Sequence, residues 1–188
     1  FEIMFACAKR GAILVPLNWR SPAAELAPIV DDCAPVLIVY GAEDAATALA
    51  LKRDGLQQLA LDYGPPAPSP AQRSSDDRRT LGSTKDAGEG AGGPYESLLA
   101  AAAPRHTETR WNGDDTWFLC YTSGTTGKPK AVIQTYQMSA VNAFHVAQAF
   151  GVRAGDRTLN FLPLFHTAGI QLVTLPTLIA GGTVIVMP

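Results

Sequence analysis

The stretch YTSGTTGKPK occupies residues 121–130 and directly follows the apolar run WFLC. Within ten residues it combines two glycines, four Ser or Thr hydroxyls and two lysines. Glycine lets a backbone approach a ligand closely, and successive N–H groups in such a turn form a concavity for anions. Lysine adds positive charge for phosphate oxygens, so the stretch predicts a polyphosphate-binding loop. The predicted phosphate-binding residues are Thr122, Ser123, Gly124, Thr125, Thr126, Gly127, Lys128 and Lys130.

A nucleoside-triphosphatase P-loop is the main alternative for such a stretch. That loop needs a glycine five positions before the Gly-Lys pair, a Ser or Thr after the lysine, and then a helix. Here Thr122 stands at the glycine position, Pro129 follows Lys128, and the apolar residues 131–133 predict a strand. We therefore predict a strand–loop–strand arrangement instead of a P-loop.

Strand and helix patterns alternate on both sides of this loop. Strands are predicted at residues 12–17, 36–40, 58–61, 116–121, 131–135, 158–162 and 183–187. Helices are predicted at residues 2–10, 22–33, 43–54 and 137–150. The second helix has Ser21 as its expected N-cap and Pro22 at its first position. This order predicts an α/β fold of βαβ units, with a largely parallel sheet flanked by helices.

The composition excludes several classes of protein. The 188 residues are 47% hydrophobic, and 15 Lys and Arg against 17 Asp and Glu give a net charge of −2. A nucleic-acid-binding protein would carry a basic surplus. The three cysteines, at positions 7, 33 and 120, form no closely spaced pair, which indicates free thiols in a reducing cytoplasm.

Two segments stand apart in composition. Residues 62–94 are rich in Pro, Gly, Ser and charged side chains, and they predict a long exposed loop. Residues 158–188 contain no charged side chain. Prolines and the Gly181-Gly182 pair interrupt this second segment, so we predict short buried elements there and no transmembrane span. An apolar surface on these elements would favour self-association of the isolated chain through residues 158–188.

Three stretches together resemble the adenylate-forming (AMP-binding) superfamily. Residues 121–130 are similar to its phosphate-binding signature, and GAILVPLN at 11–18 is similar to an upstream family segment. LPLFHTAG at 162–169 is similar to the motif that lines the acyl pocket. The Phe165-His166 pair resembles the acyl-CoA synthetase branch, the fatty-acid or aryl-CoA ligases, more than the amino-acid-activating domains, which usually carry an aspartate there.

The resemblance implies a reaction and a set of ligands. The enzyme would activate a fatty or aryl carboxylic acid with ATP and Mg²⁺, and would transfer the acyl group to coenzyme A, a step in fatty acid metabolism. His166 would contact or gate the acyl carboxylate, and Thr122 would offer a hydroxyl to the magnesium ion. Ala131, Gln134 and Tyr136 depart from the family pattern.

The resemblance also implies motifs that these 188 residues do not contain. Members carry a Gly-Tyr-Gly-x-Thr-Glu segment, a Thr-Gly-Asp segment and a lysine in a C-terminal domain. We therefore expect residues 1–188 to form part of the N-terminal ATP- and acyl-binding domain, with no complete catalytic set and no activity alone. The alternative is a non-catalytic ATP-binding module or subunit.

Overall fold

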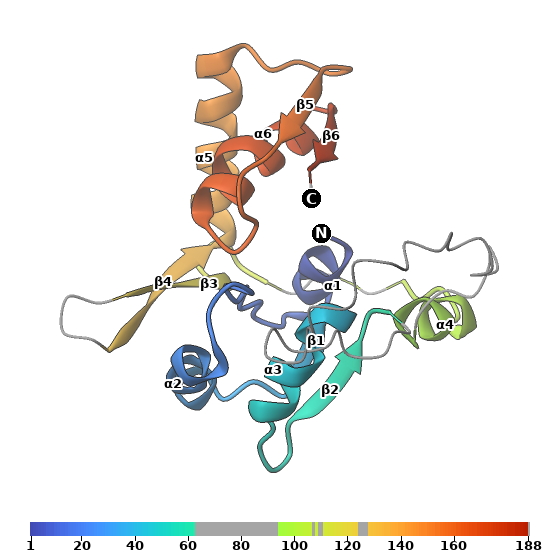
Figure 1. Ribbon diagram of the computed structural model, residues 1–188. Helices are drawn as coiled ribbons and strands as arrows, with labels where there is room; N and C mark the ends of the chain where they lie inside the picture. Colours follow the sequence, from blue (N-terminus) through green and yellow to red (C-terminus); the bar gives the residue numbers. More distant parts are fainter. Residues whose placement is uncertain (63–93, 107, 109–110, 124–127, 188) are drawn as a thin grey trace, which may run out of the picture. The chain divides into compact units, whose positions relative to one another are not determined.

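The computed structural model describes residues 1–62, 94–106, 108, 111–123 and 128–187 (Figure 1). The predicted loop at residues 62–94 lies outside the described residues except at its two ends. The chain divides into two compact units. Unit 1 comprises Phe1–Asn18 and Arg105–Pro188, and unit 2 comprises Trp19–Pro104.

Unit 2 contains one βαβ arrangement. Its elements are α2 (Ala23–Cys33), β1 (Leu37–Tyr40), η1 (Ala42–Asp44), α3 (Ala45–Ala50), β2 (Gln57–Ala60) and α4 (Pro94–Ala101). Strands β1 and β2 pair in parallel, with Leu37 opposite Gln57 and Tyr40 opposite Ala60. Parallel strands need a crossover connection, and η1 and α3 supply it.

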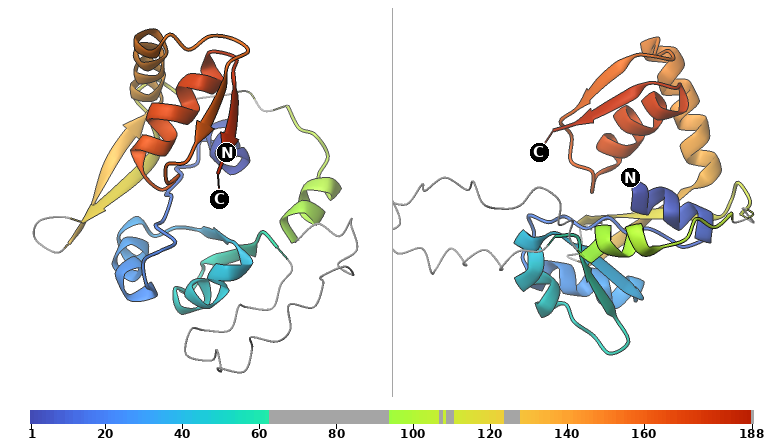
Figure 2. Two further views of the ribbon diagram at one scale, coloured as in Figure 1. Left: turned by 45° about the horizontal axis from the view of Figure 1, so that its top comes forward. Right: turned by 90° about the vertical axis from the view of Figure 1, so that its right-hand side faces the viewer.

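Unit 1 contains one antiparallel and one parallel strand pair. Its elements are α1 (Glu2–Arg10), β3 (Thr116–Ser123), β4 (Pro129–Thr135), α5 (Tyr136–Phe150), β5 (Arg157–Asn160), the π-helical η4 (Ala168–Thr174), α6 (Leu175–Ile179) and β6 (Thr183–Val186). Strands β3 and β4 form an antiparallel hairpin, whereas β5 and β6 are parallel. Helix α6 lies between α5 and the β5–β6 pair (Figure 2).

The core of unit 1 joins α1 to the β3–β4 hairpin. Phe118 is completely buried, and Met4 and Ala8 of α1 pack in the same cluster. The indole Nε1 of Trp117 donates to the main-chain oxygen of Met4 at 3.3 Å. The ring of Trp117 also stacks on Tyr136, with 5.2 Å between the ring centres. These contacts hold the base of the hairpin against α1, which lies more than 100 residues earlier in the sequence.

The α/β class and the order of most elements are confirmed, but some boundaries are wrong. The strand predicted at 12–17 is only a bridge between Leu14 and Phe118, because Pro16 has no N–H group with which to continue the ladder. Pro22, and not Ser21, is the N-cap of α2. The helix predicted at 43–54 ends at Ala50, and a turn with Gly55 at a φ of 77° follows.

Residues 158–187 form several short elements, as predicted, but the strands β5 and β6 are mostly exposed and not buried. Two of the elements are helical. Pro176 was expected to interrupt this segment, but it lies in the first turn of α6, which follows η4 directly. Among the residues that the structure describes, no helix has both the length and the apolar character needed to cross a bilayer.

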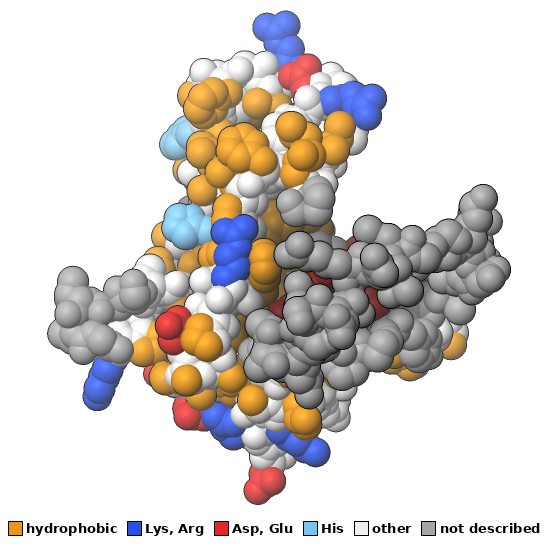
Figure 3. Space-filling model, in the orientation of Figure 1, with side chains coloured by type: hydrophobic (Ala, Val, Ile, Leu, Met, Phe, Trp, Pro, Cys, Tyr) orange, Lys and Arg blue, Asp and Glu red, His pale blue; other side chains and the backbone are white. Residues whose placement is uncertain are grey.

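Hydrophobic side chains remain exposed on the part of unit 1 that carries α5, β5 and β6 (Figure 3). Phe150 and Phe161 are each 72% exposed, and Leu159 is 50% exposed. Large exposed apolar patches promote association. Self-association through residues 158–188 stays a prediction, and these side chains support it.

Candidate functional site

The β3–β4 hairpin carries both ends of the predicted phosphate loop. Thr122 lies opposite Lys130, and Ser123 lies opposite Pro129, at the last pairs of the ladder. The strand–loop–strand prediction is therefore confirmed, and the strand β4 stands where a P-loop would have a helix. Gly124, Thr125, Thr126 and Gly127 lie outside the described residues, as does the side chain of Ser123.

Two lysines project from the second arm of the hairpin. Lys128 and Lys130 are both exposed. Among the residues that the structure describes, neither ammonium group has a carboxylate within ion-pair distance. The ion pair found among these residues joins Arg53 to Asp31. The positive charge of the two lysines is therefore available to an anionic ligand. The facing hydroxyl of Thr122 donates weakly to the main-chain oxygen of Lys130 at 3.5 Å.

The described residues provide few side-chain ligands for a metal ion. No group of three His, Cys, Asp or Glu side chains that could hold a metal occurs among residues 1–62, 94–106, 108, 111–123 and 128–187. The Thr122 hydroxyl can provide one oxygen ligand, the donor type that magnesium prefers. Magnesium commonly keeps several waters and binds through substrate phosphates, so this hydroxyl fits an ion that arrives together with a nucleotide.

The segment that contains His166 is fixed at both ends by the buried Asn160. The Asn160 side-chain oxygen accepts the N–H of Leu162 at 2.9 Å, and its nitrogen donates to the oxygen of Gly169 at 2.9 Å. Gly169 also lies against the preceding backbone, because a Cβ at this position would come within 2.4 Å of the Pro163 oxygen. The predicted motif is thus a closed, well-supported turn between β5 and η4.

The imidazole of His166 is exposed, and a backbone N–H group two residues later orients it. Its Nδ1 accepts the N–H of Ala168 at 3.3 Å. Because Nδ1 accepts, the neutral ring carries its proton on Nε2, which can donate to a ligand. His166 is therefore not a core residue of unit 1, and it presents one N–H donor at the surface.

A buried polar network connects the hairpin to the element that follows His166. Gln171 of η4 donates to the Gln134 side chain in β4 at 3.1 Å and to the Ser139 hydroxyl in α5 at 2.9 Å. Neither Asn160 nor Gln171 was predicted from the sequence to have a role. The available signal in the sequence was a polar amide within an otherwise apolar run.

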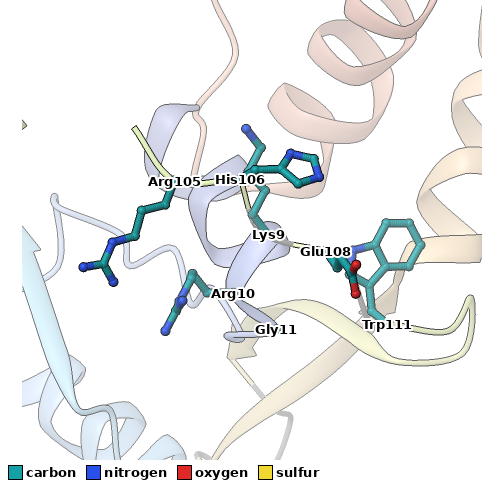
Figure 4. A pocket seen from close by; sticks show the side chains of 7 residues that line it. All are labelled: Lys9, Arg10, Gly11, Arg105, His106, Glu108 and Trp111. Carbon is teal, nitrogen blue, oxygen red and sulfur yellow. The ribbon is translucent and has the colours of Figure 1, made fainter. Parts of the chain in front are cut away.

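A cavity of about 870 Å³ lies beside the C-terminal end of α1 (Figure 4). It is lined by Lys9, Arg10, Gly11, Arg105, His106, Glu108 and Trp111. Three cationic side chains against one carboxylate make it attractive to anions. Lys9 and Arg10 also have a structural reason for their position, since a helix C-terminus favours cations. None of the residues predicted to bind phosphate or acid lines this cavity.

Comparisons with known proteins give a consistent result. The family of AMP-binding enzymes matches over residues 1–188. Indoleacetate–CoA ligase of Aromatoleum aromaticum is 35% identical over 98% of this chain and 32% of its own length. A long-chain-fatty-acid–CoA ligase of Mycobacterium tuberculosis is 33% identical over 99% of this chain and 32% of its own length.

A solved structure agrees with these relatives. The inhibitor-bound N-terminal domain of FACL13 from Mycobacterium tuberculosis superimposes with a TM-score of 0.75 at 29% identity, over 99% of this chain and 40% of that one. The chain spans about a third of the length of the curated relatives that it matches.

Proposed function

Since the chain belongs to the AMP-binding enzyme family, within its acyl-CoA ligase branch, we propose that the whole protein activates a carboxylic acid with MgATP and transfers the acyl group to coenzyme A. The observation that carries this proposal is the β3–β4 hairpin, which holds Thr122 opposite Lys130 and leaves two lysines without carboxylate partners among the described residues. We assign residues 1–188 to the N-terminal ATP- and acyl-binding domain.

In the first step, a carboxylate oxygen of the acid attacks the α-phosphorus of ATP. The bond from this phosphorus to the bridging oxygen breaks, and pyrophosphate leaves with its electron pair. Lys128, Lys130 and the Thr122 hydroxyl stabilise the charge that develops on the leaving phosphates. Ser123, Gly124, Thr125, Thr126 and Gly127 complete this set with hydroxyls and backbone N–H groups. Magnesium enters as part of the MgATP substrate.

In the second step, the thiolate of coenzyme A attacks the acyl carbonyl carbon and AMP leaves. His166 acts on the acid in both steps through its Nε2–H, which donates to a carboxylate or carbonyl oxygen. A neutral donor suits this position because it adds no fixed charge next to the phosphates. The identified relatives act on indoleacetate and on long-chain fatty acids, so we propose an apolar acid. The three free thiols suit a cytoplasmic enzyme.

The direct test is acid-dependent ATP–pyrophosphate exchange. The whole protein is expected to catalyse exchange with indoleacetate or a long-chain fatty acid, and to show only background exchange without an acid. The 188 residues alone are expected to give none, because they lack the implied segments for adenine, ribose and the reacting carboxylate. If the whole protein binds ATP but exchanges with no acid, the alternative of a non-catalytic ATP-binding module is correct.

Replacing His166 with alanine tests its role toward the acid. We expect kcat/KM for the acid to fall about 10- to 100-fold, the effect of losing a hydrogen bond to a charged group. The thermal midpoint should change little, because the side chain is exposed. His145→Ala, which removes an exposed histidine from α5, is the matched control. A lower midpoint with unchanged kinetics would instead assign His166 a structural role.

A further inference from the structure

Gln171 has all of its amide hydrogens engaged inside unit 1. Its side chain is 8% exposed. The Nε2 group donates to Gln134 Oε1 at 3.1 Å and to Ser139 Oγ at 2.9 Å. The Asn142 amide donates to the main-chain oxygen of Gln171 at 2.8 Å and, more weakly, to its Oε1 at 3.4 Å. A buried amide with this many partners has one arrangement, because any other would leave polar groups unsatisfied.

Gln171 and its partners belong to three different elements. Gln134 lies in β4, four residues after Lys130, which corresponds to about 13 Å along a strand. Ser139 and Asn142 lie in α5. Gln171 itself lies in η4, whose first residue, Ala168, donates to Nδ1 of His166. One side chain therefore contacts the arm that carries Lys130 and belongs to the helix that orients His166.

We propose that Gln171 is a positioning residue for adenylation, which holds the phosphate-binding hairpin and the His166 segment in one fixed relation. The proposal rests on the proposed function, since it assumes that the hairpin binds phosphates and His166 the acid. In-line attack on phosphorus requires the carboxylate and the α-phosphate to be placed together, and small displacements slow such reactions strongly. A fixed connection between the two sites meets this requirement.

Gln171→Leu removes the connection with little change of volume. Ser139 keeps its bond to the Thr135 oxygen at 3.0 Å, and Asn142 keeps the main-chain oxygen of residue 171. The fold should therefore persist. Gln148→Leu makes the same change at an exposed position of α5 and is the control. Gln134→Leu removes the partner in the hairpin, so the double variant should behave like either single variant if this bond is what matters.

Hydrogen exchange on the whole protein tests the connection without measuring activity. In Gln171→Leu, the amides of β4 should exchange about 2- to 10-fold faster, as expected from the loss of one hydrogen bond, whereas Gln148→Leu should leave them unchanged. In the whole protein, Gln171→Leu should lower the adenylation kcat/KM about tenfold and raise KM for ATP and for the acid together.

The positioning role of Gln171 and the proposed adenylation function can be refuted separately. Unchanged exchange in β4, or a rise in only one of the two KM values, overturns the positioning role while the proposed function stands. A wild-type whole protein that shows no acid-dependent exchange overturns the proposed function, and with it the role of Gln171 in adenylation.

Discussion

Lys128→Ala in the whole protein is expected to slow acyl-adenylate formation by about 10²–10³, the usual effect of removing one donor to charge that develops in a transition state. Lys128 is exposed at the start of the second hairpin arm, and no carboxylate among the described residues neutralises it. No contact among the described residues therefore uses the charge of Lys128 to stabilise the fold. Thr126→Ala, which removes a predicted hydroxyl of the same loop, is expected to slow the reaction in the same direction.

Pre-steady-state release of pyrophosphate measures this step. Lys128→Arg keeps the charge and should retain more activity than Lys128→Ala. Lys52→Ala, at an exposed lysine of unit 2, is the matched control and should behave like the wild type. All three variants should keep the wild-type thermal midpoint, since exposed substitutions change stability by about 0.5 kcal/mol or less. Normal pyrophosphate release in both Lys128→Ala and Thr126→Ala would refute the phosphate assignment.

Gly169→Ala is expected to lower the free energy of unfolding by about 3 kcal/mol or more, at the upper end of the cost of overpacking. The new Cβ would lie 2.4 Å from the oxygen and 2.9 Å from the carbon of Pro163, and 3.0 Å from the oxygen of Leu162. These are backbone atoms, so no side-chain rotation can relieve the contact. The turn that carries His166 would have to move, and activity should fall together with stability.

Urea denaturation of the chain measures the change, and Gly41→Ala provides the control. Gly41 has a φ of −77°, which alanine adopts readily, and the nearest atom to an added Cβ is 3.9 Å away. Gly41→Ala should change stability by about 0.5 kcal/mol or less. Equal denaturation midpoints for the two variants would mean that the His166 turn does not pack closely on Gly169.

The sequence was most informative where structure depends on near neighbours. The hairpin was predicted because its turn residues and its two apolar arms are adjacent in the chain. The strand at 12–17 was wrong because its length depends on pairing with Phe118, more than 100 residues later, and on the missing N–H of Pro16. The parallel β5–β6 pair was foreseen as two strands, but the helices between them were not.

In the candidate site, too, features set by neighbouring residues were predicted and features that join distant residues were not. His166 was found through a local motif, and the bond that orients it comes from Ala168, two residues away. Gln171 was missed because its main partner, Gln134, is 37 residues away. The cavity beside α1 was missed for the same reason, since it brings residues 9–11 together with Arg105, His106, Glu108 and Trp111. Periodicity and motif spacing describe one segment at a time, whereas these features join distant segments.

The bond from Trp117 to Met4 spans 113 residues of sequence, and this separation sets an order of events during synthesis. At about 5–20 residues per second, a ribosome needs roughly 6 to 23 s to make the chain between them. Unit 2, residues 19–104, emerges in that interval and contains its own parallel strand pair. Throughout that time Met4 and Ala8 of α1 lack the hairpin residues Trp117 and Phe118, with which they form the core cluster of the folded unit.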